Sequence, residues 1–180
     1  MTREEKFVVN PLIRWFKHQK PKWKFHKPKH GTSATGWDIE ARRKNQDLLI
    51  EAKYIYGPFL ASLNGLVTAP LANRRQHFMK RKYRSWSYGV CWAISTNYTQ
   101  RNIYQPLFDY FSRNFPFWSH YVRDLHMKYV FFVQDGRVAK ISFDKILRQS
   151  ERYKILARDR KLDERRIIAD KLMKSKLIFS

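Results

Sequence analysis

Cysteine is almost absent from this sequence, and its scarcity excludes two kinds of stabilisation. The only one among 180 residues is Cys91, so no internal disulfide can form and a reducing compartment is expected. Because Cys91 lies in an apolar run, we expect it to pack in the core rather than to react. His26 and His30 have a ligand-like spacing, but one distant cysteine cannot complete a zinc finger, and an exposed pair on a basic loop is the better interpretation.

Long apolar runs and secretory features are missing as well. No uninterrupted apolar stretch approaches the roughly 20 residues that a bilayer-spanning helix needs. The first residues, MTREE, lead straight into an amphipathic segment instead of a signal peptide. We therefore expect no membrane partner and a cytoplasmic location.

Acidic residues are few beside basic ones. Only 15 Asp and Glu accompany 37 Lys and Arg, which gives a formal net charge of +22. Such an excess repels itself unless a polyanion offsets it, and nucleic acid is the default partner. Hydrophobic residues at 43% and aromatics at 16% nevertheless argue against disorder. We expect one domain over residues 1–180, with a core over about 1–143 and a basic helical extension over about 144–180.

The segment between Lys53 and Asp109 contains no acidic residue at all. It predicts a helix from about 59 to 81, divided by Pro70. The end of this helix carries charge of one sign, whereas a protein surface normally mixes signs, so we expect it to contact phosphates. A solvated helix end is the alternative. The expected nucleic-acid-binding residues are Arg74, Arg75, Lys80, Arg81 and Lys82.

Two short segments, GWDIE at 36–40 and LLIEAK at 48–53, carry the chemistry. The apolar start of the second follows the polar turn KNQD at 44–47 and predicts a buried strand. Because strand side chains alternate, Glu51 and Lys53 project together and Ala52 points the other way. If the segment of Asp38 pairs antiparallel with this strand, two carboxylates and an ammonium converge. Carboxylates suit Mg²⁺, and a nearby lysine can orient or deprotonate water or stabilise phosphate charge.

Asp38, the apolar run and Glu51-Ala52-Lys53 resemble the PD-(D/E)xK nuclease superfamily, although Trp37 stands where the superfamily pattern has proline. The resemblance implies a restriction-endonuclease-like fold and a metal-dependent endodeoxyribonuclease that uses Mg²⁺, with Mn²⁺ able to substitute. Asp38 and Glu51 would be metal ligands, the carbonyl of Ala52 a further ligand, and Lys53 the catalytic lysine.

The superfamily often contributes a glutamate from its first helix, which residues 2–18 predict here. Thr2 is the expected N-cap with Glu5 at the capping-box position, and Pro11 predicts a kink or an early break. Glu5 precedes apolar residues at the offsets seen in junction resolvases of this fold. The resemblance therefore implies Glu5 as the fourth site residue, and an acid that only complements the helix dipole is the alternative.

The rest of the chain predicts further elements around this motif. They are an exposed edge strand within 20–29, a small-residue loop at 31–36, a strand at 88–95, helical spacing over 104–115, an aromatic segment at 115–118, a hairpin of 129–133 with 137–141 around Asp135-Gly136, and helix from Asp144 onward. The aromatic segment is core, a dimer contact or a wedge that stacks on unpaired bases. The C-terminal helices either lie on nucleic acid or pack on a second subunit, so a homodimer stays open.

Together these elements predict an α/β fold, with a mixed central sheet flanked by helices. The expected order is an αβββαβ core followed by an extra hairpin and C-terminal helices. The expected function is cleavage of double-stranded or branched DNA, as in Holliday-junction-resolvase-, phage- or transposon-type nucleases or a compact restriction enzyme. The alternative is a non-catalytic basic protein that binds RNA or DNA, in which Asp38, Glu51 and Lys53 gather by accident.

Overall fold

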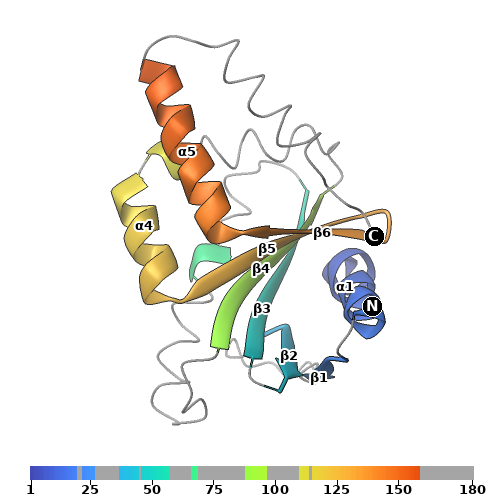
Figure 1. The fold of residues 1–180 in the computed structure, drawn as a ribbon. Coiled ribbons are helices and arrows are strands. Elements are labelled where there is room, and N and C mark those ends of the chain that lie inside the picture. The colour runs from blue at the N-terminus through green and yellow to red at the C-terminus, as the bar shows by residue number, and fades with distance from the viewer. Residues whose placement is uncertain are drawn as a thin grey trace.

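The computed structural model describes residues 1–19, 22–26, 37–44, 46–56, 66–68, 88–96, 110–113 and 115–158. These residues form a six-stranded mixed sheet with helices on both faces (Figure 1), which confirms the predicted α/β class. The elements are η1 (Glu5–Val9), α1 (Asn10–His18), β1 (Lys24–His26), β2 (Ile39–Arg43), β3 (Gln46–Ile55), β4 (Tyr88–Thr96), α4 (Phe115–Asp124), β5 (Met127–Gln134), β6 (Arg137–Ser142) and α5 (Phe143–Arg158).

The strands lie in the sheet in their chain order. β1, β2 and β3 form an antiparallel meander, β3, β4 and β5 are parallel, and β6 returns antiparallel to β5. Parallel neighbours need crossover connections, and helical residues occur in both: 66–68 between β3 and β4, and 110–113 with α4 between β4 and β5. The predicted strand beside the Glu51 strand and the predicted hairpin are thus confirmed.

Each face of the sheet has its own core. α1 covers one face, and α4 and α5 cover the other (Figure 1). Along β3, Leu48, Ile50 and Ala52 belong to the core on the α1 face, whereas Leu49 and Ile55 belong to the core on the α4–α5 face. Glu51 and Lys53 fall in the second series, so they share a face and Ala52 points away from it, as predicted.

The first helix changes geometry at Pro11 without ending there. The π-helical turn η1 stops at Val9, the Asn10 N–H donates to the Glu5 carbonyl, and α1 then continues to His18. Proline is tolerated in the first turn of an α-helix, where its missing N–H would have no partner. Of the kink or early break expected at Pro11, the early break is therefore wrong.

Two further boundaries differ from the predictions. The polar turn is shorter than 44–47, because Gln46 and Asp47 already belong to β3. Asp47 lies opposite Arg42 of β2, and its Oδ2 is 3.6 Å from Nε of Arg42. The aromatic segment is the start of α4, a helix that the sequence did not predict. In α4, Trp118 is buried while Phe117 is 44% exposed.

Three further local predictions agree with the structure. β1 is an exposed edge strand next to β2 alone, and Cys91 is fully buried. Asp135 and Gly136 have φ of 50° and 78° in the hairpin turn, as a two-residue type I′ turn requires. The 31–36 loop and the chain after 158 lie outside the described residues.

Within the described ranges, no helix combines the length and apolar character that crossing a bilayer demands.

Trp92 on β4 is the largest fully buried side chain among the described residues, and its ring packs edge-on against Phe143 of α5 at a centroid distance of 5.2 Å. We expect Trp92→Ala to lower the free energy of unfolding by about 3–5 kcal/mol through lost contacts and an unfilled cavity. Urea unfolding measures the change. Phe117→Ala, an exposed aromatic on α4, is the matched control and should cost less than about 1 kcal/mol. Equal losses in both variants would show that Trp92 is not a core residue.

Candidate active site

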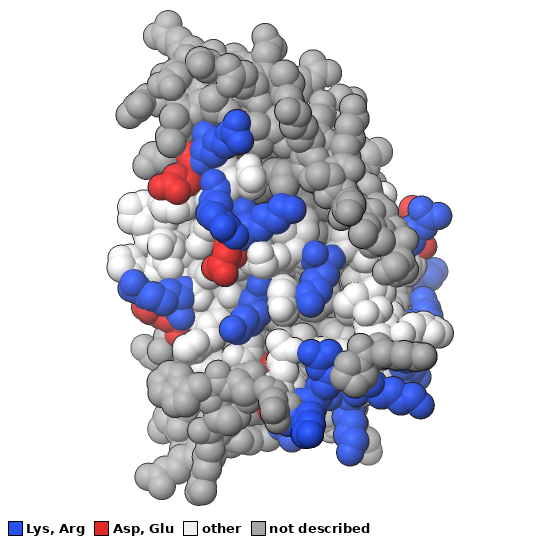
Figure 2. All heavy atoms as spheres, in the orientation of Figure 1, with Lys and Arg blue, Asp and Glu red and all other residues white. Residues whose placement is uncertain are grey.

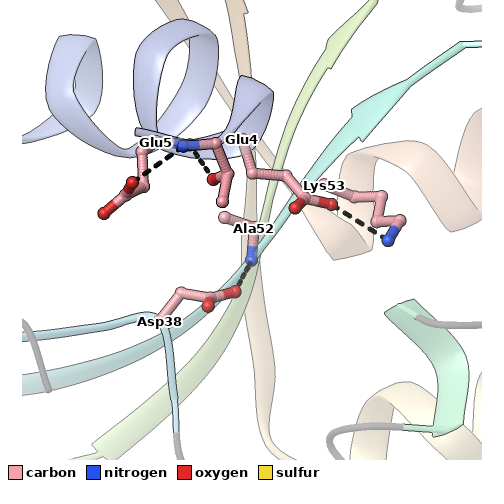
Figure 3. A network of polar contacts seen from close by, with 6 residues as sticks. Glu4, Glu5, Asp38, Ala52 and Lys53 are labelled. Atoms are coloured by element: carbon pink, nitrogen blue, oxygen red, sulfur yellow. Dashed lines mark hydrogen bonds and ion pairs between the residues drawn. The ribbon is translucent and has the colours of Figure 1, made fainter. Parts of the chain in front are cut away.

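Asp38 is held at the point where two strands separate. The pairing of β2 with β3 ends at Ile39 and Ile50, so the next residue pair in this register would be Asp38 opposite Glu51. Beyond that point the Ala52 N–H has no β2 residue to bond, and it donates instead to Oδ2 of Asp38 at 2.7 Å (Figure 3). The antiparallel pairing expected from the sequence is confirmed, and it brings the Asp38 carboxylate to the Glu51-Ala52-Lys53 segment.

The Glu51 side chain is half-buried in surroundings that disfavour its negative charge. Its Oε2 atom is buried and has no hydrogen-bond partner among the described residues. The pKa of Glu51 is raised to about 8, first by burial and then by the Asp38 carboxylate, and Lys53 offsets this rise only in part. In such surroundings the protonated form of the carboxyl group is favoured, or the ionised form next to a cation, because an unpaired buried charge is costly.

Lys53 contacts the N-terminal helix. Its Nζ lies 2.9 Å from Oε1 of Glu4, and both side chains are a little more than one-third exposed. Figure 3 shows Glu4 extending from the helix toward Lys53, above the strand that carries Ala52. An ion pair this exposed contributes little to stability. It does hold the ammonium at the Glu51 end of β3, and Glu4 also raises the pKa of Glu51.

Glu5, the helix acid expected at the site, forms a capping box. Its Oε2 accepts the Thr2 N–H at 2.9 Å, and its own N–H donates to Oγ1 of Thr2 at 3.1 Å. The structure brings Glu4 to Lys53 instead, because neighbouring helix residues point about 100° apart. Sequence reasoning missed Glu4 although a signal was present: the capping box already engages Glu5, which leaves the adjacent acid to reach β3.

Tyr121 on α4 is a second residue near the site that the sequence did not single out. Its hydroxyl donates to the Val67 carbonyl at 2.9 Å. Burial raises the pKa of Tyr121, and the Glu51 carboxylate is close enough to add to that rise. Tyr121 belongs to the buried core on the α4–α5 face, so it helps to give Glu51 its apolar surroundings.

The donors available for a cation are two carboxylates and one carbonyl. Among the described residues, no three His, Cys, Asp or Glu side chains lie close enough together to form a metal site by themselves. Asp38 and Glu51 supply carboxylates. The N–H and C=O of one strand residue project to the same edge of the strand, so the Ala52 carbonyl is directed to the edge where its N–H bonds Asp38. The unpartnered Oε2 of Glu51 and this oxygen set fit a hard divalent cation.

The predicted nucleic-acid-binding residues cannot be placed relative to this site. Arg74, Arg75, Lys80, Arg81 and Lys82 all lie outside the described residues.

Comparisons with known proteins add no relative. No protein-family model matches the chain, and no curated protein or solved structure matches it significantly.

The raised pKa of Glu51 makes a prediction about pH in the absence of metal. Below pH 4.5, Glu51 is protonated in both states, whereas between 4.5 and about 8 it is ionised only in the unfolded protein. The free energy of unfolding should therefore fall through this window, by up to about 1.4 kcal/mol per pH unit from this group. Glu51→Gln removes the effect, so its stability relative to wild type should rise with pH and level off above 8.

Chemical denaturation in EDTA across this pH range measures the difference. Asp124→Asn, which changes an acid with a 54% exposed side chain on α4, is the matched control and should follow wild type. A pH-independent difference between Glu51→Gln and wild type would contradict the burial of an ionisable carboxylate.

Proposed function

We propose that this protein is a metal-dependent endonuclease of the PD-(D/E)xK type that hydrolyses phosphodiester bonds in DNA. The observation that carries the proposal is the partly buried Glu51 side chain, whose Oε2 has no hydrogen-bond partner among the described residues and whose pKa is raised by burial, by Asp38 and by Glu4. Like charges gathered in this way destabilise the fold unless a cation or a proton offsets them. A structural role alone gives no reason to bury them together.

The element order also supports the proposal. An N-terminal helix, three antiparallel strands and a fourth strand parallel to the third follow one another in the described chain. The expected αβββαβ core also has a helix between its third and fourth strands, where residues 66–68 are helical. In this proposal β5 and β6 are the additional hairpin, and α5 is the start of the C-terminal extension.

In this proposal Asp38, Glu51 and the Ala52 carbonyl hold the cation, which is Mg²⁺ or, as a substitute, Mn²⁺. When bound, the metal supplies Lewis acidity toward the phosphate and a lowered pKa of bound water. The hydrogen bond from the Ala52 N–H fixes Asp38 in position. Burial of Glu51 strengthens its attraction for a cation, because interactions between charges are stronger away from water.

Lys53 is the proposed catalytic lysine. It lies two residues after Glu51 on the same face of β3 and carries a compact ammonium, which can orient an attacking water and stabilise charge on the phosphate. Glu4, at 2.9 Å from Lys53, is a proposed positioning residue, since it holds the ammonium rather than touching substrate.

The charge of the molecule supports a polyanionic substrate. Lys and Arg outnumber Asp and Glu across the face in Figure 2, and they gather near β1 and β2, which carry Lys24, Arg42 and Arg43. A net charge of +22 is typical of proteins that bind nucleic acid. We therefore propose DNA as the substrate and the cytoplasm as the location. The proposal includes a homodimer as the assembly.

Calorimetry with Ca²⁺, which occupies oxygen sites like those of Mg²⁺, tests the metal site without relying on cleavage. We expect wild type and Lys53→Ala to bind the ion, and Glu51→Gln and Asp38→Asn to lose at least about tenfold in affinity. Asn is preferred to Ala at position 38 because its side-chain oxygen can still accept the Ala52 N–H.

The same four proteins should then be assayed for Mg²⁺-dependent cleavage of supercoiled DNA. Wild type should cleave, while Glu51→Gln, Asp38→Asn and Lys53→Ala should not. If wild type binds DNA but neither binds a divalent ion nor cleaves, the protein is the non-catalytic nucleic-acid-binding alternative.

Glu4 and Glu5 should separate into different roles when each is changed to alanine. Glu5→Ala removes a capping-box bond and should lower stability by about 0.5–1 kcal/mol while cleavage persists. Glu4→Ala should leave stability nearly unchanged and lower kcat with little change in KM, because Lys53 loses the partner that holds its ammonium in place. Loss of cleavage in Glu5→Ala at full stability would restore Glu5 as the site residue.

A further inference from the structure

Three aromatic side chains stack beside the candidate site. The rings of Phe7 and Tyr54 are stacked with centroids 5.0 Å apart and an interplanar angle of 28°. Tyr54 and Tyr56 follow at 6.3 Å and 29°. These values are typical of offset-stacked rings. We call Phe7, Tyr54 and Tyr56 the aromatic ladder.

The aromatic ladder is anchored at its centre and exposed at its ends. Tyr54 packs against the core on the α1 face, while Phe7 is 39% and Tyr56 is 61% exposed. Exposed aromatic surface of this size is costly in water. The central ring therefore packs on the core, and the rings at both ends are partly open to solvent.

Both ends of the aromatic ladder carry positive charge. The guanidinium of Arg3 lies 5.3 Å from the Tyr56 ring centroid, and the ammonium of Lys6 lies 5.1 Å from that of Phe7. Stacked exposed rings flanked by cations are the combination with which proteins bind single-stranded nucleic acid. Bases stack on the rings, and the cations contact the phosphates.

The aromatic ladder and the candidate site lie at the same edge of β3, where no neighbouring strand is present among the described residues. Among the described residues, β3 from Glu51 to Ile55 pairs with β4 on one side, and on its other side it has no strand after Ile50. Tyr54 follows Lys53 directly on the opposite face of the strand. The Lys53–Glu4 contact of 2.9 Å already joins a residue of one face to the helix on the other. A nucleic-acid strand crossing this edge would meet both.

We propose that the aromatic ladder is a stacking platform for unpaired bases, so that the substrate is nucleic acid with a single-stranded segment next to the scissile bond. The proposal deepens the nuclease assignment and rests on it only for the link to cleavage. Binding of unpaired bases is a separate property that can be measured without metal.

Binding to a short labelled oligothymidine and to a duplex of the same length, by fluorescence anisotropy in EDTA, tests the platform. Tyr56→Ala should weaken single-strand binding about tenfold and duplex binding far less, because each stacked base contributes through its ring. Tyr56→Phe keeps the ring and should bind like wild type.

Phe117→Ala is the matched control, an exposed aromatic on α4 that has no part in the aromatic ladder, and it should also bind like wild type. Unchanged binding by Tyr56→Ala, an equal loss in Tyr56→Phe, or a loss in Phe117→Ala alone overturns the platform. Cleavage by wild type with Mg²⁺ is measured in a separate assay.

If wild type cleaves while Tyr56→Ala binds single strands normally, the platform proposal fails and the nuclease proposal is kept. If Tyr56→Ala loses single-strand binding and wild type does not cleave, the nuclease fails and the platform stands.

Discussion

The early end of the β2–β3 pairing is the constraint on which the candidate site depends. If the β2–β3 pairing continued two residue pairs further, the Ala52 N–H would face a strand carbonyl rather than the Asp38 side chain. Because pairing ends at Ile39 and Ile50, the Asp38 carboxylate replaces a backbone partner and is held 2.7 Å from the Ala52 nitrogen. The same ending leaves one edge of β3 without a strand in the described chain, and Lys53 contacts the N-terminal helix there.

Charge and burial oppose one another at this edge. Glu51 follows three buried residues of β3, so its carboxylate is held close to the core on the α4–α5 face, with Tyr121 nearby. Burial and the neighbouring Asp38 both disfavour its ionised form. A fold that keeps such a group gives up stability, and binding a cation would recover it. The nuclease proposal gives a physical reason for an arrangement that otherwise only weakens the protein.

Strand pattern and turn chemistry made much of the fold predictable. The alternation of Glu51, Ala52 and Lys53 follows from strand geometry alone, and the hairpin follows from Asp135-Gly136, which tolerates positive φ. The helix α4 was missed because its first residues are aromatic and include Pro116, which reads as a break although it is tolerated in a first turn.

The position of Glu4 at Lys53 was missed for a different reason. Offsets taken from a regular helix do not include the π-helical turn before Pro11, whereas the structure places Glu4 at Lys53 and Glu5 in the capping box. The pKa of Glu51 could not be foreseen either, since it depends on burial by α4 and on the approach of Asp38, which only the tertiary structure provides.

A crystal soaked in Mn²⁺ and measured for anomalous scattering tests the central claim most directly. The account predicts an anomalous peak bound by the carboxylates of Asp38 and Glu51, with the Ala52 carbonyl as a neighbour, and no such peak in Glu51→Gln. A fully ordered site without a peak, or a Mn²⁺ ion bound elsewhere while Glu51 stays protonated and unpaired, would contradict it.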